Sequence, residues 1–165
     1  MSKKFKVLVI LATLLIAGFI VTPQANAQLT QKKALRLGYF PNITHAQAVI
    51  GVGNGDYQKA LGNNIELKPF TFNAGPSATE ALLANQIDAT YIGPNPTVNG
   101  YVVSQGTADR VISGAASGGA VFVVRNDSGI QSTKDFAGKK FASPQLGNTQ
   151  DVALRKYLLD NGYKT

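Results

Sequence analysis

Apolar positions along the chain predict strands that alternate with helices. Leu35–Phe40 and Ile65–Phe72 alternate apolar and polar residues with the period of two that a strand requires. Ala89–Ile92 is short, apolar and β-prone, as a buried parallel strand would be. Further expected strands are the β-prone runs at 110–113, 120–124 and 140–142. Strands that alternate with helices predict an α/β fold with a parallel sheet.

Cap and turn residues mark the expected helices in the first half of the chain. Asn42 or Thr44 can cap a helix over 45–52, and the glycine-rich run at 51–55 then ends it. A second, shorter helix is expected over 57–61.

Two loops that contain both Gly and Pro open the next helices. Ser77 and Glu80 have the spacing of a capping box, in which each side chain bonds to the other residue's backbone N–H. In the second loop, Asn95 is a suitable N-cap and Pro96 fits the first helical position. Both loops therefore place a helix start beside a strand end.

The last part of the chain predicts a short helical turn and a longer helix. Ser132 can cap a turn through Phe136. A helix follows the loop 143–149 and runs through Leu159, with Gly162 just past its end.

The first 27 residues have the features of a secretory signal peptide. Lysines precede an apolar stretch at 7–21, and Ala25-Asn26-Ala27 forms an A-x-A cleavage site. We expect cleavage after Ala27 and a protein of the periplasm or extracellular face. An uncleaved N-terminal anchor is the alternative.

Composition narrows the possible partners. The formal charge is +7, and loss of the three lysines in the leader lowers it to +4, from 13 basic and 9 acidic residues. This balance suits an anionic ligand, whereas scattered basic residues do not form the stripe that nucleic acid requires. The absence of cysteine excludes disulfides, thiol nucleophiles, cysteine metal sites and a lipid-modified cysteine.

Four motifs resemble the substrate-binding proteins of ABC importers, in the branch for aliphatic sulfonates, taurine and nitrate. The motifs are LRLGYFPNITHA at 35–46, ALLANQIDA with the following GPNP at 81–96, VISGAASGGAVFVVR at 111–125 and GKKFASPQLGNTQDVALRKYL at 138–158. The resemblance implies a type II periplasmic-binding-protein fold with two lobes around a cleft. It implies a first lobe over 34–118 and a second over 119–165. Because family members are about twice this length, we expect the second lobe to be incomplete.

The resemblance also implies a function. We expect a non-catalytic receptor, without cofactor or metal, that binds a small oxyanion such as an aliphatic sulfonate, taurine or nitrate. It would deliver this solute to a membrane permease driven by an ATPase, and it would be a monomer that binds no nucleic acid.

Four loops that precede helices are expected to converge on the cleft, where backbone N–H groups, hydroxyls and amides suit an oxyanion. The candidate ligand-binding residues are Asn42, His45, Asn73, Gly75, Ser77, Gly93, Asn95, Pro96, Gly147, Asn148 and Thr149.

Most of these candidates also have a purely structural interpretation. Asn42 can be a cap and His45 a surface residue of a helix, while Ser77 can use its hydroxyl for the capping box. The loop 93–96 can be a tight turn, and the start at 147–149 a plain N-cap.

An enzyme on the same fold is the competing hypothesis. Relatives include a pyrimidine synthase of thiamin biosynthesis, which uses a cysteine-rich motif absent here, and menaquinone-pathway enzymes. Both perform cytosolic chemistry, which a signal peptide opposes. Ser117 lacks the nucleophile-elbow context, because a strand follows it where that motif needs a helix. A sensor or adhesion module is a third possibility.

Overall fold

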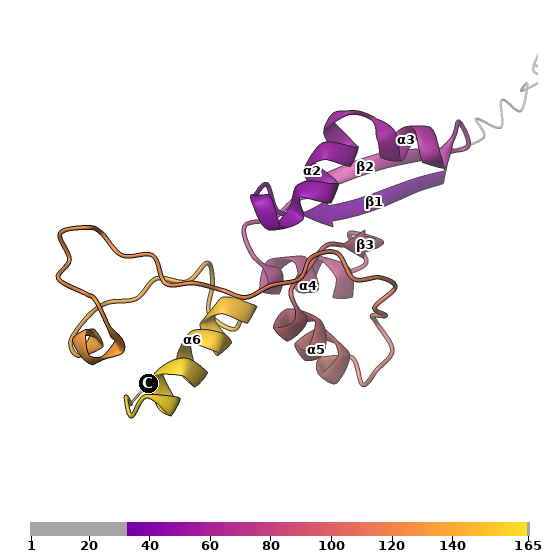
Figure 1. Cartoon of the computed structure of the whole chain (residues 1–165). Coiled ribbons are helices and arrows are strands. Elements are labelled where there is room, and N and C mark those ends of the chain that lie inside the picture. The colour runs from indigo at the N-terminus through magenta and orange to yellow at the C-terminus, as the bar shows by residue number, and fades with distance from the viewer. Residues whose placement is uncertain (1–32, 165) are drawn as a thin grey trace, which may run out of the picture. The chain divides into compact units, whose positions relative to one another are not determined.

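The computed structural model describes residues 33–164 (Figure 1), so the expected signal peptide lies outside the described residues. Three strands form one sheet in the order β2-β1-β3: β1 at Lys33–Tyr39, β2 at Ile65–Thr71 and β3 at Ala89–Thr90. Both pairings are parallel. The parallel α/β fold class is therefore confirmed.

The central strand β1 aligns the other two. Lys33 is opposite Ile65 at one end of the β1–β2 ladder, and Tyr39 is opposite Thr71 at the other. β3 pairs with β1 through two residues and continues past Thr90, because the Tyr91 N–H donates to the Gly38 carbonyl at 2.9 Å. The carboxyl ends of all three strands consequently lie at one edge of the sheet, which is where open α/β sheets bind ligands.

The helices connect these strands. They are the 3-10 helix η1 at Ile43–His45, α2 at Ala46–Gly53, α3 at Asp56–Leu61, α4 at Gly75–Leu83, α5 at Pro94–Val103, the 3-10 helix η2 at Thr133–Phe136 and α6 at Thr149–Asp160. In Figure 1, α2 and α3 run alongside β1 and β2, whereas α4 lies near β3 and packs against α5.

The capping box predicted at the start of α4 is wrong. The helix begins at Gly75, with Ala74 as its N-cap and no side-chain cap bond. Ser77 is thus already the third helical residue, and its hydroxyl is free from capping.

The predicted cap of α5 is also wrong, since Gly93 is the N-cap and Pro94 the first helical residue. Pro94 suits this position because the first helical N–H has no partner within the helix. Asn42 caps η1, whereas the helix expected over 45–52 has His45 as its N-cap. The predicted cap at Ser132 is confirmed, and Asn148 caps α6, as its structural interpretation expected.

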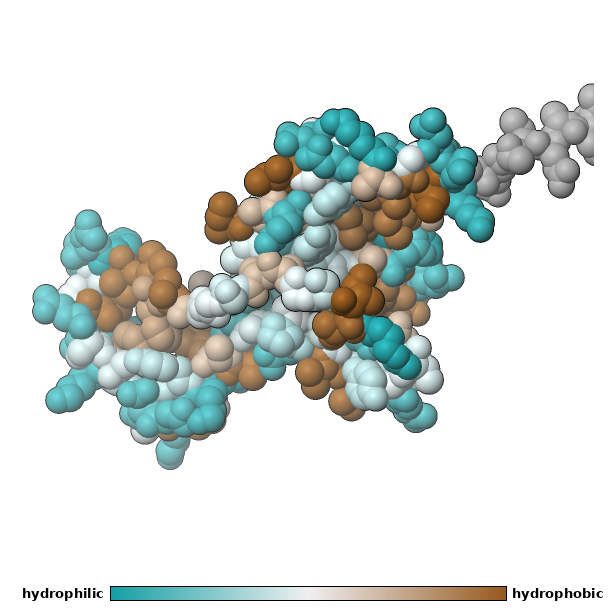
Figure 2. Space-filling model, turned by 45° about the vertical axis from the view of Figure 1, so that its right-hand side comes forward, coloured by the Kyte–Doolittle hydropathy of each residue, from teal (hydrophilic) through white to brown (hydrophobic). Residues whose placement is uncertain are grey.

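The strands predicted at 110–113, 120–124 and 140–142 do not form in the described chain. Each run has β-prone side chains, but a strand needs a neighbouring backbone to accept and donate its hydrogen bonds. Apolar surface is correspondingly visible in several places (Figure 2), and Ile112, Val121 and Val123 are each at least 85% exposed.

Two groups of buried side chains hold the chain together. Small residues dominate the first, in which Ala48, Ala78 and Ile87 are at most 2% exposed. The second is aromatic: Phe136 is 6% exposed and has Phe122 and Phe141 at centroid distances of 5.1 and 5.0 Å. Tight backbone packing therefore stabilises the sheet region, whereas aromatic contacts stabilise the region before α6.

A substitution at Gly38 can test how tightly the first group of buried residues is packed. A Cβ at this buried strand position would lie 2.7 Å from Thr90 Oγ1 and 3.0 Å from Phe72 Cε2. We expect Gly38→Ala to lower the free energy of unfolding by about 1–3 kcal/mol, the usual cost of overpacking. Urea unfolding followed by circular dichroism measures the change.

Gly53→Ala is the matched control, because nothing lies within 4 Å of a Cβ at that helical position. Its stability should equal or exceed that of the wild type. Equal changes in the free energy of unfolding for the two substitutions would show that a methyl group at Gly38 causes no overpacking.

Candidate functional site

His45 lies buried at the carboxyl edge of the sheet. It is 8% exposed, and its ring stacks on Phe40 with centroids 4.2 Å apart. Its Nδ1 accepts the Phe40 backbone N–H at 3.2 Å. The alternative of a surface histidine is therefore wrong. The alternative for Asn42 is confirmed, since Asn42 Oδ1 accepts the Thr44 N–H at 3.1 Å and caps η1.

Burial lowers the pKa of His45, because the charged ring would lose its hydration. The ring is thus neutral near pH 7. A neutral imidazole has one N–H, and Nδ1 is already an acceptor, so the proton is on Nε2. His45 can therefore donate a single hydrogen bond and carries no charge to attract an anion.

Tyr91, which was not among the predicted site residues, lies next to His45 and is paired with a second such residue, Tyr57. The ring of Tyr91 is 6.1 Å from the ring of His45, and its hydroxyl is 2.7 Å from that of Tyr57. Tyr57 packs against α2 at Gly51, where a Cβ would collide with the phenol ring. Neither tyrosine stands in a recognisable motif, and the pairing needs α3 and the end of β3 to be brought together.

The starts of α4 and α5 touch each other. A Cβ added to the buried residue Gly75 would collide with Pro96, so the space beside Gly75 is filled by protein. Neither helix has a side-chain cap, and both contain proline in the first turn. In α5, Asn95 is the one residue of the first three that has an N–H, because Pro94 and Pro96 have none.

The start of α6 meets the start of α5. A Cβ on Gly93 would collide with Thr149 Oγ1. That hydroxyl oxygen is buried and has no hydrogen-bond partner among the residues that the structure describes. Buried polar atoms are almost always paired, so an unpaired one at three meeting helix starts is notable.

An acidic side chain orders the turn before α6. Asn148 is 3% exposed, and its Oδ1 accepts the Asp151 N–H at 2.8 Å. Asp151 in turn accepts the Gly147 N–H at 2.9 Å, and this bond is the main reason that the pKa of the Asp151 carboxyl is lowered. The plain N-cap interpretation of Asn148 is thus confirmed. The side-chain oxygen of Asn148 and the backbone N–H of Gly147 both form hydrogen bonds within the turn.

One hydrogen bond joins α4 to the loop before α6. Ser77 Oγ donates to Gln145 Oε1 at 3.2 Å. Gln145 was not predicted as a site residue, although it lies two positions before Gly147 in the same loop. Sequence reasoning assigned Ser77 to local capping, and only the fold shows that its hydroxyl reaches a residue 68 positions away.

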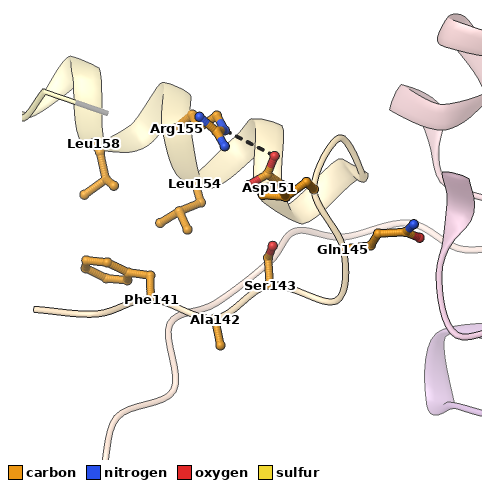
Figure 3. A pocket seen from close by; sticks show the side chains of 9 residues that line it. Phe141, Ala142, Ser143, Gln145, Asp151, Leu154, Arg155 and Leu158 are labelled. Atoms are coloured by element: carbon orange, nitrogen blue, oxygen red, sulfur yellow. Dashed lines mark hydrogen bonds and ion pairs between the residues drawn. The ribbon is translucent and has the colours of Figure 1, made fainter.

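A groove of about 510 Å³ runs between the loop 141–146 and α6. Leu154 and Leu158 of α6 point toward Phe141 across it, and Arg155 is bonded to Asp151 at 3.2 Å (Figure 3). The groove is thus apolar along one side. The guanidinium of Arg155, which is half-exposed, is paired with the carboxylate of Asp151.

The structure brings four of the eleven predicted residues together in two pairs. Gly75 is adjacent to Pro96, Gly93 is adjacent to Thr149, and Ser77 is bonded to the loop that holds Gly147 and Asn148. The side chain of Asn73 is exposed ahead of α4, and that of Asn42 bonds to its neighbour Thr44. Ligand binding by these residues stays a prediction.

Residues 33–164 contain neither a cluster of metal-ligating side chains nor a membrane-spanning helix. Within this range, no group of three His, Cys, Asp or Glu side chains comes together as a metal site would need. No helix in the same range has the length and apolar character to cross a membrane.

A comparison with known families gives one match. The model described as the NMT1-like family matches residues 28–165. No curated protein and no solved structure matches the chain.

The contact between α5 and α6 can be tested by filling the space at Gly93. We expect Gly93→Ala to lower the free energy of unfolding by about 1–3 kcal/mol, because the new methyl group displaces Thr149. Combining it with Thr149→Ala should recover part of the loss in a double-mutant cycle. Additive effects would mean that the two residues do not touch; Gly114→Ala, with open space around it, is the control.

The neutral state of His45 predicts a pH dependence. The pKa of the folded state lies below the ordinary value of 6.5, so protons bind more tightly to the unfolded chain. Stability should be constant above pH 6.5 and should fall as the pH is lowered through that value toward the folded pKa. Urea midpoints between pH 8 and pH 5 measure this slope. His45→Asn, which can still accept from Phe40, should flatten it; an unchanged slope would assign the effect to other groups.

Proposed function

This chain belongs to the NMT1-like family, and from that premise we propose that it is a solute-binding protein for a small oxyanion. Aliphatic sulfonates, taurine and nitrate are the proposed ligands. The role is non-catalytic: the protein holds the solute and releases it unchanged.

The meeting of three helix starts is the observation that carries this proposal. The Gly75–Pro96 and Gly93–Thr149 approaches place the first turns of α4, α5 and α6 next to one another. Each start presents unpaired N–H groups and the positive end of a helix dipole. Several such starts directed at one place favour an anion there.

The neutral chemistry of the surroundings also supports an exchangeable anion. Gly75 and Ser77 of α4, Asn95 of α5, and Thr149 and Gln150 of α6 have backbone N–H groups in the first turn. The buried Thr149 hydroxyl adds a donor that has no partner among the described residues. Neutral donors hold an oxyanion without a permanent ion pair, so the anion can also leave.

We propose further that the ligand closes the site by touching two lobes. The first lobe would cover 34–118 and the second would begin at 119, so that α5 and α6 belong to different lobes. The Gly93–Thr149 contact then lies where the lobes meet. A ligand that contacts both lobes shifts the population toward the closed form.

The proposal includes export and transport. The leader at 1–27 would direct the chain out of the cytoplasm, and the mature protein would act as a monomer in the periplasm or on the extracellular face. The closed form would dock on an ABC permease, whose ATPase drives uptake of the released solute.

Calorimetric titration tests the binding role. The purified full-length protein is titrated with taurine, alkanesulfonates, nitrate and phosphonates, and we expect saturable heat from at least one. Absence of heat from all of them would overturn the oxyanion assignment.

A matched pair of variants assigns the binding to the helix starts. Thr149→Val removes the buried hydroxyl while keeping the side-chain shape, and it should weaken binding about tenfold, the effect of one lost hydrogen bond to a charged ligand. Thr107→Val, at an exposed position after α5, should bind as the wild type does. Equal affinities of the two variants would place the anion elsewhere.

A further inference from the structure

The protons of the tyrosine pair can be assigned from their partners. The Tyr57 hydroxyl lies 2.9 Å from the Gln47 carbonyl oxygen and 2.7 Å from the Tyr91 hydroxyl. A carbonyl oxygen can only accept, so the single proton of Tyr57 points to Gln47. Tyr91 must then donate its own proton to Tyr57. The oxygen of Tyr91 is left with lone pairs alone and can only accept a further hydrogen bond.

The surroundings of Tyr57 keep this arrangement in place. Its ring lies against the backbone of α2 at Gly51, the one residue type that leaves room for it. Burial is the main reason that the pKa of Tyr57 is raised to about 12. The Tyr57 hydroxyl therefore keeps its proton at any pH near neutrality.

Tyr91 lies at the edge of the sheet at which the ligand is proposed to bind. It directly follows β3 at the carboxyl edge of the sheet, and its N–H is bonded to Gly38 of β1. It lies two residues before Gly93, which touches Thr149 at the start of α6. Its side chain is half-buried and faces the ring of His45, whose Nε2 carries a proton.

We propose that Tyr91 is a specificity-determining residue of this site and that Tyr57 positions it as an acceptor; the inference rests on the proposed function. A plain oxyanion has only acceptor atoms, so its oxygens gain nothing from Tyr91. A small anion that also has an ammonium or amide N–H can donate to Tyr91 while the helix starts bind its acidic group. The site thus favours amine-bearing anions over the same anions without an amine.

Taurine and ethanesulfonate test this preference, because they differ by the amino group. Calorimetry on the wild-type full-length protein should give a dissociation constant about tenfold lower for taurine, as one charge-assisted hydrogen bond would provide. In Tyr57→Phe, Tyr91 loses the acceptor for its proton and can donate to a sulfonate oxygen. The tenfold preference should then disappear or reverse. Tyr101→Phe, at a tyrosine that is 55% exposed on α5, should keep it.

Tyr91→Phe provides a second, independent measurement. It removes the acceptor without freeing a donor, so it should lose the preference for taurine while its affinity for ethanesulfonate stays within about twofold. Should Tyr57→Phe fail to fold by circular dichroism, this variant decides the question.

The outcomes separate the inference from the function on which it rests. Absence of binding for every anion tested on the wild type overturns the proposed function and the inference with it. Binding of ethanesulfonate as tight as that of taurine, with a ratio unchanged in both variants, overturns the inference alone. A taurine preference that both variants lose and Tyr101→Phe keeps supports it.

Discussion

Close approach at two glycines is the constraint on which the arrangement of this protein depends. α4 can begin against α5 because Gly75 has no side chain to collide with Pro96, and α6 can begin against α5 because Gly93 leaves room for Thr149. With any larger residue at either position, the first turns would have to separate. The neighbouring N–H groups and the buried hydroxyl of Thr149 are consequences of this packing.

The same packing decides how an anion could be held. No charged side chain is needed at the meeting point, because dipole ends and neutral donors are concentrated there. Arg155 is paired with Asp151. The guanidinium of Arg36 is paired with the Asp88 carboxylate and donates to the Asn85 carbonyl beside the sheet. These two arginines of the described chain are thus already paired with protein groups, in a turn and beside a strand. This favours a ligand that binds reversibly.

Two kinds of core serve different parts of the chain. The sheet region is packed with alanine, glycine and one fully buried isoleucine, so backbones lie close together there. The region before α6 depends on Phe122, Phe136 and Phe141, which contact one another through their ring edges. Aromatic packing tolerates irregular backbone better than a sheet does, and the β-prone runs in this region remain without strand partners.

Local patterns in the sequence predicted the helices, the three paired strands, the parallel fold class and several caps, because these depend on neighbouring residues. They also predicted three strands, at 110–113, 120–124 and 140–142, that do not form. Asn42, Ser132 and Asn148 bond within three residues of their own positions, and such bonds can be read from spacing. The displaced starts of α4 and α5 show the limit of that reasoning. More than one residue in each loop could serve as the cap, and helix packing selected among them.

The candidate site likewise has features that local sequence predicts and features that it does not. Its loops could be predicted from their position before helices, but the roles of individual residues could not. Ser77 bonds to Gln145, Gly93 touches Thr149, and the Tyr57–Tyr91 pair joins α3 to the end of β3. Sequence alone determined which chemical groups stand at the ends of the strands. Only the tertiary structure decided which of them meet, because the contacts join residues more than 30 positions apart that no local spacing relates.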